Sequence, residues 1–323
     1  MRQWASAVVT FLLLVGPASG EELVGAQLDG PDLGFWLLPP GERLAFQDIP
    51  ADPAPDPAPL PATTERRPNW LLTSLVSGGA VAGGAINAFT DKGHQSYHFT
   101  NEGWFGADTK YGGADKASHF VDYYIVSKEL AKLFVVLGHT PGSARWLGVG
   151  VSTLTGLVNE IGDGTTRWGF SAQDLVMDFG GALTAALVDA SATEDLLGFR
   201  RGTASFDVCC GYSNKIYVAD FRLAGAARRL GLNIGPLKYL LLSLTYGTRG
   251  YPGDPEDSAT QRRVGFEVGL DFKQMLDDLN IRRNTWWGYG LHVVVDNIRV
   301  PFTAVGVRYD LNHGRWYGPN AGN

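Results

Sequence analysis

Cysteine, methionine and charged side chains are scarce in this sequence. Its 323 residues include two cysteines and three methionines, and charged residues make up 19% of the chain against 45% for hydrophobic residues. Cys209 and Cys210 are adjacent, so they cannot build a long-range disulfide framework, and without a second pair they do not suggest a tetrahedral zinc site. The low charge content indicates contact with a membrane.

Basic residues are also too few for a nucleic-acid partner. The 27 lysines and arginines are outnumbered by 33 acids, which gives a formal net charge of −6. Because binding to phosphates needs a basic face, we expect no nucleic acid among the partners. The length allows one large domain or two ordinary ones.

The first 20 residues have the features of a secretory signal peptide. A basic start at Arg2 is followed by an apolar run and by small residues before Glu21, which predicts cleavage after Gly20. The apolar run is short for an uncleaved anchor. Neither cysteine lies near this cleavage site, so we expect no N-terminal lipid. The prediction is an exported protein, periplasmic or associated with an envelope membrane.

Residues 21–68 are predicted to be a linker. Nine of the 17 prolines fall between Pro39 and Pro68, a composition that favours extended, solvated chain.

A mainly α-helical domain is predicted for residues 69–198. Residues 70–89 contain no charge and have the length of one bilayer crossing, but a buried helix in a soluble domain explains them equally well. Further helices are expected at residues 116–137, 144–161 and 171–190, with Ser143 and Ser171 as N-terminal caps. Together they predict a bundle of about four apolar helices.

Residues 199–323 are predicted to form a small α+β appendage with antiparallel strands. Apolar residues alternate with small or charged ones in residues 263–272 and 301–311, and residues 238–248 also resemble a strand. The intervening residues 273–279 and 286–298 are expected to be helical.

A small set of acids and one histidine stands out in the predicted helices. Asp115 and His119 are four residues apart, as are Asp174 and Asp178, so each pair shares one helix face. Asp115 and Asp174 are explained by helix capping or by the first-turn dipole. Glu160 and Asp178 lie inside apolar sequence, where an unpaired charge is costly.

Three hypotheses for this set remain open: a structural polar network, a ligand or catalytic site, and a metal site. In a catalytic site, His119 would act as the acid or base and Glu160 as a second proton carrier, with Asp115 or Asp178 fixing the imidazole tautomer. Alternatively, His119, Glu160 and Asp178 would hold a divalent metal. The candidate catalytic residues are thus His119, Glu160 and Asp178, the secondary residues are Asp115, Lys116 and Asp174, and the metal and any cofactor are unknown.

The motifs DKASHF (residues 115–120), NEIGDG (159–164) and GFSAQDLVMDFGGA (169–182) resemble those of the YfiM-like family of uncharacterised bacterial cell-envelope proteins. More distantly, they are similar to VanZ-like membrane domains. The resemblance covers residues 104–187 and implies a helical envelope domain of unknown activity. We therefore expect a membrane-associated protein that has a structural role or binds lipid or an envelope protein. The alternative is an enzyme that acts on a lipid or cell-wall precursor.

Overall fold

The structure is a computed structural model, and it describes residues 67–90, 93–203, 212, 215–252, 259–281 and 285–318. All of them belong to the unit of the chain that contains Arg67–Asn323. The predicted signal peptide, nearly all of the predicted linker, Cys209 and Cys210 lie outside the described residues.

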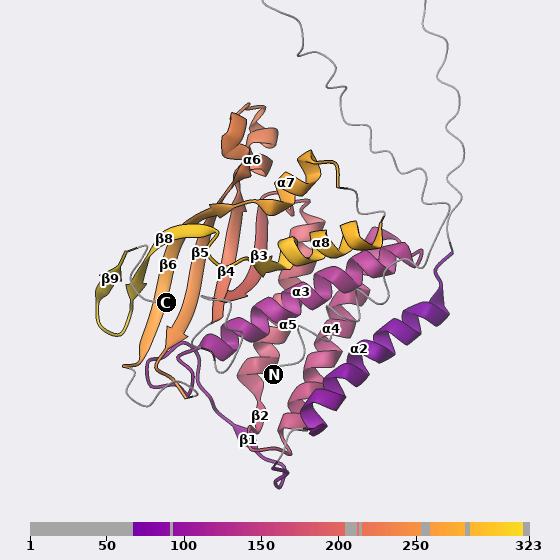
Figure 1. The fold of residues 1–323 in the computed structure, drawn as a ribbon. Helices are drawn as coiled ribbons and strands as arrows, with labels where there is room; N and C mark the ends of the chain where they lie inside the picture. Colours follow the sequence, from indigo (N-terminus) through magenta and orange to yellow (C-terminus); the bar gives the residue numbers. More distant parts are fainter. Residues whose placement is uncertain are drawn as a thin grey trace, which may run out of the picture. The chain divides into compact units, whose positions relative to one another are not determined.

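Four long helices form one layer of this unit. Helix α3 packs against α4 and α5, and α2 packs against α4 (Figure 1). Buried residues of three of these helices meet in one apolar cluster, which contains Val76, Leu130, Phe134 and Ala144. The four helices are α2 (Trp70–Thr90), α3 (Ala114–Val136), α4 (Pro141–Asp163) and α5 (Ala172–Ala190).

The N-terminal caps of two helices were predicted from serines. Ser171 does cap α5, since its Oγ accepts a hydrogen bond from the backbone N–H of Asp174 at 3.2 Å. The predicted cap at Ser143 is wrong. Thr140 caps α4 instead, with Pro141 in the first turn, where the missing N–H of proline costs no hydrogen bond.

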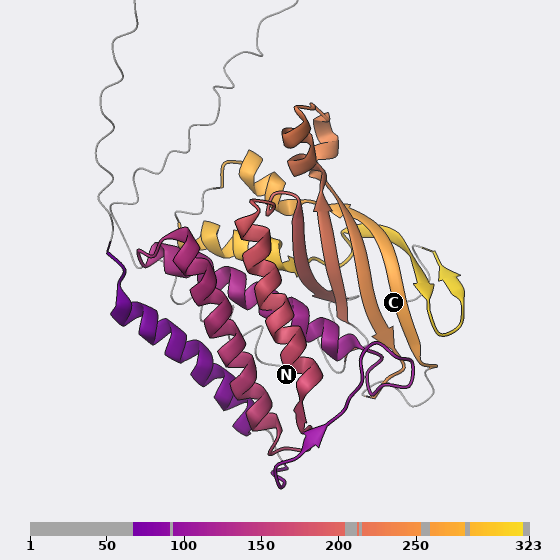
Figure 2. The same ribbon diagram turned by 180° about the vertical axis from the view of Figure 1, so that it is seen from behind.

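A seven-stranded sheet forms the second layer, with strand order β7-β3-β4-β5-β6-β8-β9 (Figure 2). Neighbouring strands are antiparallel except β3 and β7, which are parallel. The strands are β3 (Leu197–Thr203), β4 (Lys215–Arg222), β5 (Leu240–Arg249), β6 (Gln261–Leu270), β7 (Ile298–Arg299), β8 (Ala304–Asp310) and β9 (Arg315–Tyr317).

Short elements complete the described residues. A parallel two-residue ladder joins β1 (Phe99–Thr100) to β2 (Phe170–Ser171) and holds the loop before α3 against the start of α5. The remaining helices are α6 (Leu223–Leu230), the 3-10 helix η1 (Gly235–Tyr239), α7 (Phe272–Asp278) and α8 (Trp286–Asn297).

Helix α3 packs on one face of the sheet. The ring of Phe199 on β3 makes edge contacts with Phe120 and Tyr124 of α3, at centroid distances of 5.3 and 5.0 Å. The opposite face of the sheet carries buried charge: the guanidinium of Arg200 pairs with Asp220, and Ser243 donates to the same carboxylate. The sheet is therefore apolar on the helix side and polar on the other.

The predicted fold class, a mainly α bundle with a small appendage, is wrong. About 50% of the described residues are helical and 22% are in strands, and the seven-stranded mixed sheet is a full layer. Strand β3 was not predicted because its buried positions are Gly198, Arg200 and Gly202. None of these is a large apolar residue, so the sequence shows no apolar alternation. The predicted domain boundary at residue 198 falls at the start of β3 and stays a prediction.

None of the helices in the described part of the chain combines the length and the apolar character that a membrane crossing requires.

Candidate functional site

Two glycines set the start of α3 and thereby place its first turn. Gly112 and Gly113 have φ values of +61° and +85°, in the left-handed region that favours glycine. A Cβ at Gly113 would overlap the backbone and ring of Phe105, and one at Gly112 would overlap the ring of Tyr251. The loop therefore packs tightly at the residues that precede Asp115 and Lys116.

The ammonium of Lys116 lies inside a group of three carboxylates, which we call the Lys116 cluster. Its Nζ is 2.9 Å from Glu102 Oε2, 2.7 Å from Asp115 Oδ2 and 2.8 Å from Asp174 Oδ1. The lysine side chain is fully buried. Three surrounding carboxylates supply the charge and the acceptors that a buried ammonium needs.

The electrostatics of the Lys116 cluster follow from this arrangement. Burial lowers the pKa of Lys116, but Asp174, Asp115 and Glu102 outweigh it and hold the pKa above its ordinary value. Burial raises the pKa of Glu102, yet Lys116 lowers it to about 2. Burial raises the pKa of Asp115 to about 6 against the influence of Lys116. Lys116 is thus charged throughout the physiological range.

His119, Glu160 and Asp178 form a second group beside the first, here called the His119 cluster. They come from α3, α4 and α5 and are all buried, and one ligand atom from each lies within 4.8 Å of the others. Nδ1 of His119 is 2.7 Å from Asp178 Oδ1. The two clusters are linked because His119 Nε2 lies 3.7 Å from Asp174 Oδ1.

Burial is the largest influence on the pKa values of the His119 cluster. It raises the pKa of Glu160 to about 9 and that of Asp178 to about 6, while the nearby His119 lowers both. Burial lowers the pKa of His119, but Asp174 and Asp178 raise it well above its ordinary value. Burial thus favours the neutral forms of the two carboxyl groups, while Asp174 and Asp178 favour the protonated imidazole.

Glu160 is fixed by the start of α5. Its Oε2 accepts a hydrogen bond of 2.9 Å from the backbone N–H of Ser171. Ser171 itself caps α5, so the side chain of Glu160 is held at the N-terminus of α5.

The second oxygen of Asp178 points at a glycine on α4. A Cβ at Gly156 would overlap Oδ2 of Asp178, so only glycine leaves room for this carboxylate. Gly156 stands one turn before Glu160, on the same face of α4. Asp178 is fully buried, and its Oδ2 has no hydrogen-bond partner among the described residues.

The sequence-predicted residues thus fall into two adjacent groups. The structure brings His119, Glu160 and Asp178 together, and it places Asp115, Lys116 and Asp174 in the neighbouring cluster. Of the two aspartates proposed to fix the imidazole tautomer, Asp178 is the one within hydrogen-bond distance of His119 Nδ1. Glu102 was not assigned to the site, because it lies in a loop 14 residues from Lys116, with no helical spacing to connect them.

A second buried charge network was not predicted from the sequence. Asp296, at the end of α8, lies 3.3 Å from the Nζ of Lys128, 3.4 Å from that of Lys132 and 2.8 Å from the guanidinium of Arg222. Glu129 accepts a hydrogen bond from Asn297 at 2.9 Å. These contacts join α3 to α8 and the sheet, and they explain why α3 carries so much charge while buried.

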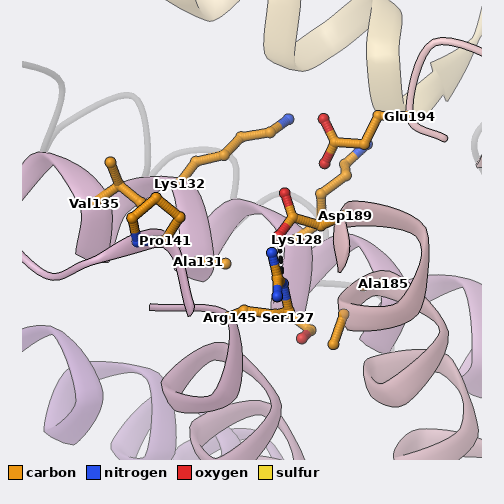
Figure 3. A pocket seen from close by; sticks show the side chains of 11 residues that line it. Ser127, Lys128, Ala131, Lys132, Val135, Pro141, Arg145, Ala185, Asp189 and Glu194 are labelled. Carbon is orange, nitrogen blue, oxygen red and sulfur yellow. Dashed lines mark hydrogen bonds and ion pairs between the residues drawn. The ribbon is translucent and has the colours of Figure 1, made fainter. Parts of the chain in front are cut away.

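Two pockets lie away from the His119 cluster. One, of about 60 Å³, is lined by Lys128, Lys132, Arg145, Asp189 and Glu194 among others, with Arg145 paired to Asp189 (Figure 3). The other is an apolar groove of about 310 Å³ where α3 and α5 meet the sheet. Neither includes His119, Glu160 or Asp178, so the buried cluster suits a proton or a metal ion better than a bulky substrate.

One face of the sheet is apolar and open beyond the helices. Leu244, Phe266 and Val307 are paired across β5, β6 and β8, with 65, 47 and 41% of their surfaces exposed. Val268 and Val305 form the next cross-strand row. We call these five residues the apolar sheet face. It is bordered by Tyr309 and by Trp316, which is 71% exposed, with ring centroids 5.0 Å apart.

Charge is divided between the two faces of the sheet. Because cross-strand partners share a face, Asp220, Glu267 and Asp310 lie opposite the apolar sheet face, and all three are buried. The described strand residues on the apolar side include Lys215 and Arg262 and no acid, and Arg201 on the same side pairs with Asp122 of α3. The open face thus combines apolar, aromatic and basic groups.

Comparison with known proteins supports the class of protein but no activity. Residues 101–190 match the model of a family described as predicted periplasmic lipoproteins (DUF2279). The match contains every residue of both clusters, and the protein is exported and periplasmic or envelope-associated. The searches of curated proteins and of solved structures found no match to the chain. The match supports an uncharacterised bacterial envelope family, while the YfiM-like and VanZ-like resemblances stay predictions.

Proposed function

We propose that this protein is an envelope protein that lies against an anionic membrane surface through the apolar sheet face. The observation that carries the proposal is the exposed row of Leu244, Phe266 and Val307 on a face whose strand residues include no acid. Exposed apolar surface of this kind marks interaction sites.

The border of the face supports a bilayer as the occupant. Tryptophan and tyrosine favour the headgroup level of a membrane, where Trp316 and Tyr309 would lie. Basic side chains are attracted to anionic lipids, and Arg262 and Lys215 are on this side of the sheet. The neighbouring 310 Å³ groove, which shares Leu244 with the apolar sheet face, has room for part of an acyl chain.

Vesicle flotation tests this proposal. The exported chain is mixed with vesicles of phosphatidylethanolamine and phosphatidylglycerol, and its binding is compared with that of a Leu244→Ser/Phe266→Ser variant. Losing two apolar side chains from the interface removes about 3–6 kcal/mol, so we expect binding to weaken by at least about 100-fold. The control is Leu187→Ser, an equally exposed position on α5, which should bind like the wild type.

Two outcomes would overturn the proposal. One is equal binding by the wild type and the double variant. The other is a stable dimer of the wild type that the double variant disrupts, since the face would then be covered by a second copy of the chain.

An enzyme acting on a lipid or cell-wall precursor is the second candidate. It is favoured by the 2.7 Å contact between His119 and Asp178, an arrangement that fixes an imidazole for proton transfer, with Glu160 beside it. A lipid comparison between a deletion strain and one carrying His119→Ala tests it. Identical lipid profiles of wild type and both mutants would refute it.

A further inference from the structure

We propose that His119, Glu160 and Asp178 bind a divalent transition-metal ion. The inference is independent of membrane binding through the sheet. It rests on the geometry of the three side chains and on the unpaired oxygen of Asp178.

The spacing of the three side chains fits one ion. Their ligand atoms lie within 4.8 Å of one another, and the Nδ1–Oδ1 separation of His119 and Asp178 is 2.7 Å. Ligand atoms about 2.0–2.2 Å from one ion lie at most about 4.4 Å apart, so small side-chain movements would bring all three onto it. Three rigid helices supply the ligands, so little reorganisation is needed to close around an ion.

The unpaired oxygen of Asp178 indicates that the cluster is built for a further cation. Oδ2 is buried and has no hydrogen-bond partner among the described residues, although burying an unpaired carboxylate oxygen is costly. It faces α4 at Gly156, where any larger residue would displace it. Asp178 thus packs against α4, the helix that also carries Glu160.

The neighbouring Lys116 cluster shows how the fold treats a comparable acid group. Glu102, Asp115 and Asp174 also bring three carboxylates within 4.8 Å, but there the ammonium of Lys116 lies between them. Among the described residues, the ion pair that Asp178 makes is with His119. A lysine fills one cluster, and the other offers an imidazole and two carboxylates as ligands.

The ligand set selects the class of metal. One imidazole nitrogen with carboxylate oxygens suits Zn²⁺, Mn²⁺ or Fe²⁺ better than Ca²⁺, which prefers oxygen alone. When Nδ1 ligates the ion, Nε2 faces Asp174, a carboxylate placed to orient the ring.

Calorimetric titration of the chelator-treated full chain with ZnCl₂ and with MnCl₂ tests the inference. We expect one ion per chain for at least one metal, and binding at least 10-fold weaker in Glu160→Gln and in Asp178→Asn. Glu129→Gln, a buried acid of the second network, is the matched control and should bind like the wild type. Absence of binding by the wild type, or equal binding by all variants, would overturn the site.

A measurement on the wild-type protein alone guards against variants that fail to fold. X-ray absorption of the zinc-loaded chain should show one imidazole nitrogen and oxygen ligands. Sulfur ligands would contradict the site and would point to Cys209 and Cys210 instead. Failure of either test leaves the membrane proposal standing, because the apolar sheet face shares no residue with this cluster.

Discussion

Nδ1 of His119 lies 2.7 Å from Oδ1 of Asp178, and the two residues are separated by 59 positions in the sequence. This contact ties α3 to α5 inside an apolar layer. It depends on Gly156 of α4, which leaves the space that the Asp178 carboxylate occupies. A histidine, an aspartate and a glycine from three helices thus form one unit.

Substitution of Gly156 tests that dependence. In Gly156→Ala the new Cβ would overlap the Asp178 carboxylate, so we expect a loss of about 1–3 kcal/mol in the free energy of unfolding. The matched control is Gly150→Ala on the same helix, where a Cβ meets nothing within 4 Å. Alanine there should be neutral or stabilise by up to about 1 kcal/mol. Urea denaturation measures the free energy of unfolding of both variants. Equal effects of the two substitutions would refute the close packing of Gly156 against Asp178.

The pKa of Glu160 predicts how the stability of the metal-free protein depends on pH. Burial raises this pKa from 4.5 to about 9 in the folded state, so unfolding releases a proton between these values. The free energy of unfolding should therefore fall as pH rises from about 5 to 9, by up to about 1.4 kcal/mol per pH unit from this group. Asp178, raised to about 6, acts in the same direction at lower pH.

Glu160→Gln provides the comparison, because glutamine mimics the protonated acid. Its stability should change less steeply over the same pH range, and near pH 5 it should unfold at nearly the same urea concentration as the wild type. Parallel stability curves for the two proteins would show that Glu160 is ionised in the folded state.

Removing the Lys116 ammonium should strongly destabilise the fold. Lys116→Met leaves three carboxylates without their central cation, and breaking a buried ion pair costs about 3–5 kcal/mol. Lys110→Met is the control: Lys110 also pairs with Glu102 but is 36% exposed, so its loss should cost about 0–1 kcal/mol. Similar losses in the two variants would mean that the Lys116 cluster is no more than a solvated ion pair.

The sequence predicted the four long helices to within a few residues, because their apolar runs are long. Ser171 marked the start of α5, whereas the start of α4 was predicted three residues late, at residue 144. The sequence also indicated that His119, Glu160 and Asp178 share an interior, since helical spacing leaves few other positions for them. The structure does bring these residues together, although their role stays a prediction.

Strands β5, β6 and β8 were predicted from the sequence, but the full seven-stranded sheet and the second charge network were not. Strands β3 and β6 bury Arg200 and Glu267, so the usual pattern of apolar-inside alternation is inverted there, and β4 buries Asp220 along with its apolar residues. The partners of Lys128 and Glu129 lie 168 residues away, at Asp296 and Asn297, and no local spacing links them. Both features are products of tertiary packing.

The depth of Trp316 in a bilayer tests the central claim most directly. Vesicles that contain phosphatidylglycerol and brominated phosphatidylcholine quench tryptophan that enters the membrane interface, and Trp316→Phe identifies the contribution of this residue among the nine tryptophans. We predict that bound wild-type protein is quenched and that Trp316→Phe, still bound, loses a clear part of the quenching. Equal quenching of the two bound proteins would contradict the proposal that the apolar sheet face lies on the membrane.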